Sequence, residues 1–252
     1  MKRTQRFFYL HLIILCIVLA ACGRDTAPVD SIAAAAYYQN PALLEQAWQQ
    51  PVAATYREHF EYQINGAFCG PAAVVNLFRS LDIDSYNQEN LFEKAPVGYW
   101  KARFLGLNLD ELAGLIQANA ALDVTVLRDL TREEFRSHLR RTNDPAYRYL
   151  INFNRQPLFG VAIGHHSPLG GYLPDVDLVF VLDVLDEYKP FLAPADRLYA
   201  AMDTVDSETG KKRGLLVIRV ATQPVTLSPK ALSPTQTRDA ATEPAMRERV
   251  AP

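Results

Sequence analysis

One cysteine of the chain stands where a helix is expected to begin. Cys69 is followed by Gly70 and Pro71, and Pro71 presets the backbone angle of a first helical turn. The next ten residues, 72–81, carry apolar side chains at spacings that fit one buried helix face. A thiol at a helix N-terminus faces unpaired N–H groups and the positive end of the dipole, and both favour the nucleophilic thiolate. Cys69 is therefore a candidate nucleophile, although a small buried cysteine without chemistry would leave the same pattern.

Two later stretches supply the other groups that such a nucleophile needs. His165 and His166 are neighbours, and Asp183 ends an apolar run that begins at Leu178. A cysteine nucleophile, a histidine base and a carboxylate that orients the imidazole form an acyl-transfer triad. Because neighbouring residues on a strand point to opposite faces, only one of the two histidines can face Cys69. The residues therefore predict acyl-transfer chemistry, with the triad in the chain order Cys, His, Asp.

A series of short motifs extends this pattern along most of the chain. They are Gln63 with residues 67–70, the run 164–172, residues 182–184, residues 188–190 and the long run 201–214. In this order, over roughly residues 37–220, they resemble the catalytic domain of phytochelatin synthase, the glutathione γ-glutamylcysteinyltransferase family, in its half-size bacterial form. The resemblance implies an α+β, papain-like cysteine protease fold. Its helical N-terminal half would carry Cys69, and its antiparallel sheet would carry His165 and Asp183.

The resemblance also implies catalytic roles for individual residues. His165 is implied as the base, and Asp183, eighteen residues later, as the group that orients its imidazole. Gln63 stands six residues before Cys69, where papain-like enzymes place the oxyanion-hole amide. His166 occupies a position that is usually apolar or aromatic in the family, so we expect it to be a packing or surface histidine.

The same resemblance implies a site for the γ-glutamyl group of glutathione. This group carries a free α-ammonium and a free α-carboxylate. Asp206 and Arg213 flank a turn at Thr209-Gly210, and the family places the binding of these two charges on their positions. Without the resemblance, a charged surface turn would be the favoured interpretation of both residues. Arg155 also matches a family arginine near the active site and is expected to contact substrate.

Departures from the family pattern bear on the reaction. Asp186 and Glu187 stand where full-length members have basic residues that could bind a second glutathione, and the chain ends in a polar tail instead of a cysteine-rich half. We therefore expect water to take the acyl group more readily than a second glutathione does. No cofactor and no protein-held metal are expected, and heavy-metal ions would enter as metal–thiolate complexes of the substrate. Two alternatives stay open: a papain-like peptidase acting on other small peptides, and a non-catalytic lipoprotein that binds metal or thiol through Cys69 and His165.

The N-terminus has the features of an export signal. Residues 1–21 carry three cations, no acid and an apolar run from Phe7 to Leu19, which is typical of a signal peptide. The small residues before Cys22 resemble a bacterial lipobox, so we expect Cys22 to be lipidated, the alternative being an ordinary signal with an incidental cysteine. Residues 22–36 would be a tether, 37–222 the catalytic domain and 223–252 a disordered, proline-rich tail. The protein would be exported and lipid-anchored to a bacterial membrane, facing the periplasm.

Charge and cysteine content limit the partners. The formal net charge is −2, and removal of the signal peptide leaves 23 basic against 28 acidic residues. A nucleic-acid partner is therefore not expected. Glutathione is the expected ligand, the lipid anchor is the expected membrane contact, and a homodimer stays open. Only Cys69 would remain as a free thiol in the domain, so no disulfide would hold the fold.

The apolar patterns predict elements that fit an α+β layout. Helices are expected over 40–50, 72–81 and 108–119, and a further helix is expected to start after the capping box of Thr131 and Glu134. Strands are expected over 122–127, 147–153, 158–166, 178–184 and 214–220. Residues 87–100 are expected to be irregular. A helical first half followed by strands indicates an antiparallel sheet with helices packed on it.

Overall fold

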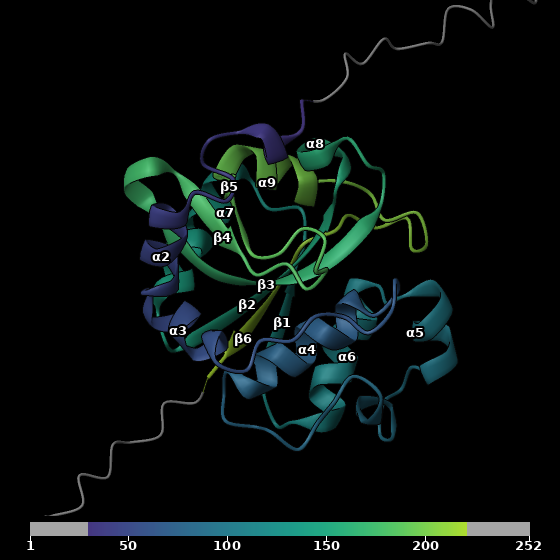
Figure 1. Ribbon diagram of the computed structural model, residues 1–252. Coiled ribbons are helices and arrows are strands. Elements are labelled where there is room, and N and C mark those ends of the chain that lie inside the picture. Colours follow the sequence, from purple (N-terminus) through teal and green to yellow (C-terminus); the bar gives the residue numbers. More distant parts are fainter. Residues whose placement is uncertain (1–29, 221–252) are drawn as a thin grey trace, which may run out of the picture. The chain divides into compact units, whose positions relative to one another are not determined.

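An antiparallel sheet forms the centre of the molecule (Figure 1). The structure is a computed structural model that describes residues 30–220. Within this range the sheet has six strands in the order β1-β6-β2-β3-β4-β5. The strands are β1 (Asp123–Leu127), β2 (Tyr147–Asn154), β3 (Gly164–Leu173), β4 (Leu178–Val181), β5 (Phe191–Pro194) and β6 (Leu215–Arg219).

Helices cover both faces of the sheet. Those before the sheet are α2 (Pro41–Trp48), α3 (Pro51–Arg57), α4 (Cys69–Arg79), α5 (Tyr99–Leu105) and α6 (Leu109–Asn119). Those among or after the strands are α7 (Arg132–Arg140), α8 (Gln156–Phe159) and α9 (Ala195–Met202). Short 3-10 turns occupy Ile32–Ala34, Asn90–Phe92, Arg141–Asn143 and Pro174–Val176.

The alternation of side chains along β2 separates two cores. Tyr149, Ile151 and Phe153 pack in a cluster that includes residues of α7 and α9. Leu150, which points the other way, packs with α4 and α6. A third cluster packs α2 and α3 against Leu178 and other residues of β4. The result is an α+β fold with a helical first half, as the sequence predicts, and α4 packed against β3.

Several predicted helix starts are confirmed. Asn108 and Glu111 form a capping box at the start of α6, and Thr131 and Glu134 form another at the start of α7. In each box the side chain of the capping residue accepts a hydrogen bond from the backbone N–H of the glutamate three residues later. The glutamate side chain in turn accepts one from the backbone N–H of the capping residue. The Cys69 helix begins at Cys69 itself and ends at Arg79.

Other predicted elements are wrong in their bounds or type. The helix expected over 40–50 ends at Trp48, and Pro51 starts the separate helix α3. The strand expected over 158–166 is wrong in its first half. There the chain forms the one-turn helix α8, which Gly160 ends with a positive φ of 77°. The stretch 87–100 was expected to be irregular throughout, but α5 begins within it at Tyr99. The strand β5 and the helix α9 were not expected.

The N-terminal boundary of the domain also needs correction. Residues 30–36, expected to belong to the tether, are part of the fold. Ile32 is buried in the core, and the backbone oxygen of Asp30 accepts a hydrogen bond from Arg197 at 2.8 Å. The expected signal peptide 1–21, the lipidation site Cys22 and the tail 223–252 lie outside the described residues. None of the helices within residues 30–220 is long and apolar enough to cross a membrane.

Candidate active site

The three predicted triad residues meet at one place in the fold. Cys69 is the first residue of α4, His165 lies at the start of β3, and Asp183 follows β4. Because β3 pairs with β4, His165 and Asp183 become neighbours, with His165 Nε2 3.0 Å from Asp183 Oδ1. The His165 imidazole also acts on the Cys69 thiol, whose pKa it lowers. The arrangement is a cysteine, an imidazole and a carboxylate in line, as acyl transfer requires.

The charges of this cluster support one another. Burial alone raises the pKa of the Cys69 thiol, but the facing His165, a backbone hydrogen bond with His166 and the charge of Arg155 hold it below its ordinary value. Burial lowers the pKa of His165, yet the Asp183 carboxylate and the Cys69 thiolate together more than offset this, and the pKa is raised. Burial raises the pKa of Asp183, and His165, Arg155 and the Leu185 N–H together hold it below its ordinary value. The site therefore favours a thiolate–imidazolium pair backed by a carboxylate.

Arg155 lies behind the triad, away from the cavity. Its Nη2 donates to both oxygens of Asp183, at 3.0 and 2.8 Å, and only 2% of the residue is exposed. Its guanidinium lies over the Tyr188 ring, 3.8 Å from the centroid. The Nη2 group is thus bound to Asp183, whereas Nη1 is buried without a partner among the described residues. Arg155 does not line the cavity beside Cys69, and its contact with substrate stays a prediction.

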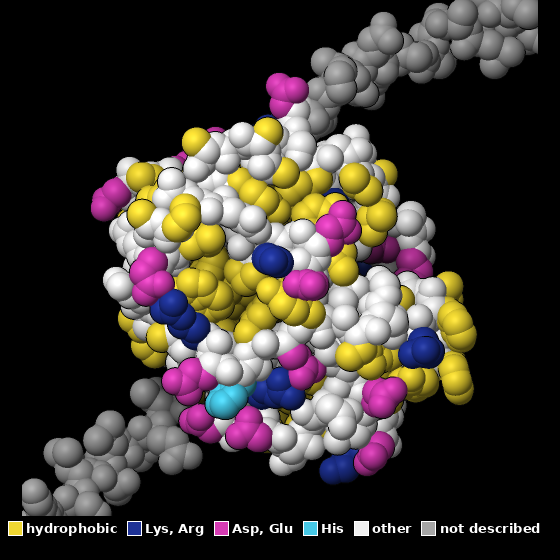
Figure 2. Space-filling model, viewed as in Figure 1, with side chains coloured by type: hydrophobic (Ala, Val, Ile, Leu, Met, Phe, Trp, Pro, Cys, Tyr) yellow, Lys and Arg dark blue, Asp and Glu magenta, His cyan; other side chains and the backbone are white. Residues whose placement is uncertain are grey.

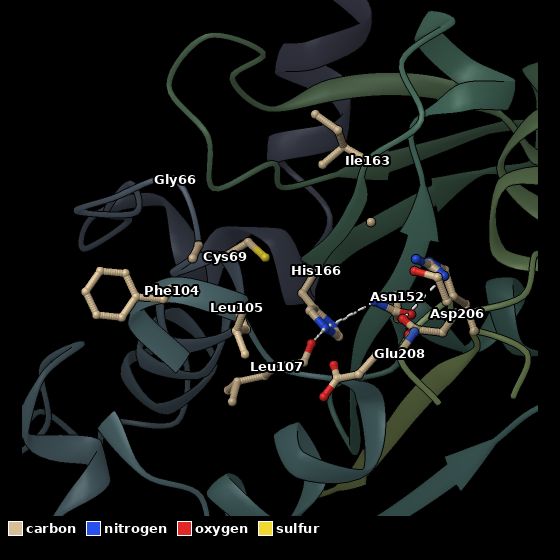
Figure 3. Close-up of a pocket in the computed structure, with 15 residues that line it drawn as sticks. Gly66, Cys69, Phe104, Leu105, Leu107, Asn152, Ile163, His166, Asp206 and Glu208 are labelled. Carbon is tan, nitrogen blue, oxygen red and sulfur yellow. Dashed lines mark hydrogen bonds and ion pairs between the residues drawn. The ribbon is translucent and has the colours of Figure 1, made fainter. Parts of the chain in front are cut away.

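A cavity opens beside Cys69 (Figure 3). Its volume is about 300 Å³, and it is lined by Cys69, Asn152, His166, Asp206, Glu208 and Arg213, with apolar walls from α5 and Ile163. In Figure 3, His166 and Asn152 lie between Cys69 at one side and Asp206 at the other. The cavity is thus reactive at one end and charged at the other.

The charged end is the pair that the sequence singles out. Arg213 Nη1 lies 3.4 Å from Asp206 Oδ2, and the same nitrogen donates to the Val205 carbonyl. Arg213 is only 6% exposed, and its buried Nε has no partner among the described residues. Gly164 lets the guanidinium approach, since a Cβ there would lie 2.6 Å from Arg213 Nη2. The pair is a partly dry site with an unused donor, not a solvated surface turn.

Two residues that sequence reasoning did not assign to the site lie in the cavity wall. Asn152 Nδ2 donates to the His165 carbonyl at 3.2 Å, and its Oδ1 is buried without a partner among the described residues. His166 Nε2 donates to the Leu107 carbonyl at 2.8 Å, and burial lowers the pKa of His166 to about 4. His166 therefore stays neutral and packs, as expected. A polar residue within the apolar strand 147–153 was the available signal for Asn152.

Gln63 is anchored near the triad but does not line this cavity. Its backbone N–H donates to the Val184 carbonyl at 2.8 Å, and Val184 packs in one cluster with Cys69. Its Nε2 donates to the Asn65 carbonyl at 2.7 Å, and its Oε1 is buried without a described partner. One of the two side-chain amide hydrogens of Gln63 is thus already used, and the role of Gln63 in binding the oxyanion stays a prediction. Residues 30–220 contain no group of three His, Cys, Asp or Glu side chains that could hold a metal ion.

Comparison with solved structures finds peptidase domains. The peptidase domain of Streptococcus ComA aligns with a TM-score of 0.43 and 14% identity, covering 64% of this chain and 98% of that one. A double-glycine motif protease from an AMS/PCAT transporter aligns with a TM-score of 0.41 and 12% identity, covering 63% and 88%. These likenesses are too low to carry an argument. The papain-like arrangement rests on the positions of Cys69, His165 and Asp183 described above.

Sequence comparison gives a definite result. Glutathione gamma-glutamylcysteinyltransferase 2 of Arabidopsis thaliana is 28% identical over 173 residues, covering 64% of this chain and 38% of the relative. Glutathione gamma-glutamylcysteinyltransferase 1 of Triticum aestivum is 31% identical over 173 residues, covering 64% and 34%. The chain thus matches little more than a third of the length of these relatives. The phytochelatin synthase family model matches residues 27–215, which is well over half of the chain. The protein belongs to the phytochelatin synthase family.

Proposed function

We propose that the protein cleaves the Cys–Gly bond of glutathione through a γ-glutamylcysteinyl thioester on Cys69. One observation carries the proposal: Cys69 and the pair Asp206–Arg213 line the same cavity. A nucleophile at one end and an acid–guanidinium pair at the other match a substrate with a scissile carbonyl and an amino-acid head. Asp206 would bind the α-ammonium, and Arg213 would bind the α-carboxylate through its free donors.

The geometry supports a two-step mechanism. The Cys69 thiolate attacks the carbonyl carbon of the Cys–Gly amide, and the Cys69 N–H and Gln63 hold the oxyanion. The backbone N–H groups in the first turn of α4 have no partner within the helix, so they can donate to that oxygen. The His165 imidazolium protonates the leaving glycine nitrogen, the C–N bond breaks and the thioester forms. His165 then takes a proton from water, which attacks the thioester and releases γ-glutamylcysteine and the thiolate.

The charges on the surface beside the triad favour water as the acceptor of the acyl group. Asp186 and Glu187 are both exposed directly after the triad, so they would repel the carboxylates of a second glutathione. Transfer to glutathione, which would make phytochelatin, is proposed as the slower outcome. Heavy-metal ions would act here as thiolate complexes of the substrate, not through a metal site of the protein.

Product analysis tests the proposal. After incubation with glutathione, we expect equal amounts of glycine and γ-glutamylcysteine, and a smaller amount of the product with one added γ-glutamylcysteinyl unit. Chromatography with mass detection measures all three products. Release of the γ-glutamyl group, or no cleavage at any glutathione concentration, would contradict it.

We also propose that the mature protein is an exported lipoprotein, anchored through Cys22 to a bacterial membrane. Support comes from the apolar run and the small residues before Cys22. Cys22→Ser is expected to leave an unprocessed or soluble chain, because lipidation needs the thiol. Membrane fractionation and intact mass of both proteins check this. Identical fractionation and an N-terminal mass without lipid in the wild type would refute it.

Arg155 gives a further prediction, because it is a positioning residue for Asp183. We expect Arg155→Met to lower the free energy of unfolding by about 3–5 kcal/mol at neutral pH, as removal of one partner from a buried ion pair does. The pKa of Asp183 is held below its ordinary value, so its contribution is present above that value and is lost as pH falls through the folded pKa. Losing Arg155 raises that folded pKa, so the loss of stability begins at higher pH.

The same variant should shift activity. The charge of Arg155 also lowers the pKa of Cys69, so the acid limb of the pH–rate profile should move to higher pH in Arg155→Met. Arg148→Met is the matched control. Arg148 is equally buried, but it bonds Ser80 and Pro145 away from the triad. The control should lose stability without moving the acid limb, and an unmoved limb in Arg155→Met would argue against the positioning role.

A further inference from the structure

Helix α5 presents three large apolar side chains to solvent beside the cavity mouth. Trp100 is 66% exposed, Phe104 72% and Leu105 74%. We call these three residues the α5 patch. Figure 2 shows apolar side chains gathered over α5 at the right edge of the molecule. Phe104 and Leu105 also line the Cys69 cavity, so the patch and the mouth of the active site are continuous. Trp100 and Phe104 lie one helical turn apart and stack, with ring centroids 6.0 Å apart and nearly parallel planes.

The α5 patch points outward because the opposite side of α5 is fixed. Tyr99 packs edge-on against Phe68 and Phe92 in the core. Lys101 Nζ turns inward, where it donates to the Gly106 carbonyl and pairs with Glu111 and Glu208. The helix therefore cannot roll to bury the three apolar side chains against the domain. An exposed tryptophan–phenylalanine–leucine face on a fixed helix is typical of a surface that meets another apolar phase.

The N-terminus indicates which phase that is. Only residues 23–29 separate Cys22 from Asp30, and Asp30 is fixed to Arg197 on α9. An extended chain of this length spans at most about 28 Å. A lipidated Cys22 would therefore keep Asp30 within about 28 Å of the bilayer, which is less than the width of a domain whose radius of gyration is about 16 Å. Tryptophan and phenylalanine are well suited to the lipid–water interface, and the partly exposed Arg103 of the same helix can meet anionic headgroups.

We propose that the α5 patch inserts into the lipid surface to which the chain is anchored, so that the mouth of the Cys69 cavity lies at the membrane interface. The inference rests on the proposed lipid anchor, not on the proposed reaction. The lipid tail would hold the protein on the membrane, and the α5 patch would set its orientation there. Two weak attachments of this kind act together, because the first makes the second intramolecular.

The chain has two tryptophans, so fluorescence reports on the α5 patch directly. The other one, Trp48, lies on α2 and packs against Phe180. The lipidated wild type is placed on vesicles of phosphatidylethanolamine and phosphatidylglycerol with brominated acyl chains, which quench nearby indole emission. We expect Trp100 to lose most of its emission and to shift to the blue. Trp100→Phe, which leaves Trp48 alone, should show neither effect, and Trp48→Phe should keep both.

The outcomes separate the two proposals. Vesicle binding without quenching of Trp100 overturns insertion of the α5 patch and leaves the anchor intact. An unmodified Cys22 together with no vesicle binding overturns both. If Trp100 is protected instead by a second copy of the chain, its blue shift will depend on protein concentration and persist without vesicles, which also overturns the lipid proposal.

Discussion

Cys69→Ala is expected to abolish glycine release from glutathione while the protein stays folded. The side chain is small and only 8% exposed, and alanine fits the space that it leaves. Without the thiolate no thioester forms, so kcat should fall by roughly 10⁶-fold, the size seen when a triad loses its nucleophile. Steady-state glycine release measures the effect, and thermal unfolding shows whether the fold is kept. Cys69→Ser, which keeps the shape but not the low pKa, should be almost as inactive. Substantial activity in the alanine variant would remove the basis of the proposed mechanism.

The pH dependence of the wild type gives a second view of the same group. The pKa of Cys69 is lowered and that of His165 is raised, so the ion pair should exist between these two values. Activity should fall on the acid side as the thiolate is protonated, and on the alkaline side as His165 loses the proton that glycine needs. A pH–rate profile of kcat/KM for glutathione checks both limbs. A profile that rises steadily through the ordinary thiol pKa would indicate a neutral thiol–imidazole pair instead.

Arg213→Ala is expected to lower the efficiency of glutathione cleavage by about thirty- to several-thousand-fold. Truncating one partner of a buried charge pair costs about 2–5 kcal/mol, and the substrate carboxylate would lose its forked donor. The loss should appear in kcat as well as KM, because the γ-glutamyl head positions the scissile carbonyl against Cys69. Steady-state rates on glutathione and on its α-linked isomer, Glu-Cys-Gly, measure both effects.

Lys211→Ala is the matched control for that prediction. Lys211 lies in the same turn, but its Nζ points to Asp110 on the surface and its side chain is mostly exposed. We expect wild-type rates from it and strong preference for glutathione over the α-linked isomer in both the control and the wild type. Equal cleavage of the two tripeptides would favour the small-peptide peptidase, and an Arg213 variant with wild-type rates would place substrate recognition elsewhere.

Local signals in the sequence predict the parts of this fold that depend on neighbouring residues. The start of α6 at residue 108, the capping box of α7 and the strand pattern of β2 are written within a few residues, and all are confirmed. α8 was missed because its apolar residues also fit a strand, and Asn154 and Gly160 mark its start and end instead. α5 was missed because it is short and its aromatic residues face both core and solvent. Gly98 before it and Gly106 after it were the usable signals.

Contacts between distant residues could not be derived in the same way. His165 and Asp183 meet because β3 pairs with β4, which the motif order implied and the strand pattern allowed. The ion pair between Arg155 and Asp183 joins two residues that are 28 positions apart in the sequence. No local sequence pattern predicts such a contact. Likewise, Asn152 enters the cavity wall only through its pairing with His166 across β2 and β3.

The intact mass of the protein after mixing with glutathione tests the central claim most directly. At acid pH, where hydrolysis of a thioester is slow, we expect the wild type to gain the mass of one γ-glutamylcysteinyl group while free glycine appears in equal amount. The adduct should be removed by hydroxylamine and should be absent from Cys69→Ala. Cleavage of glutathione without any adduct on Cys69, or an adduct that includes glycine, would contradict a γ-glutamylcysteinyl thioester on this cysteine.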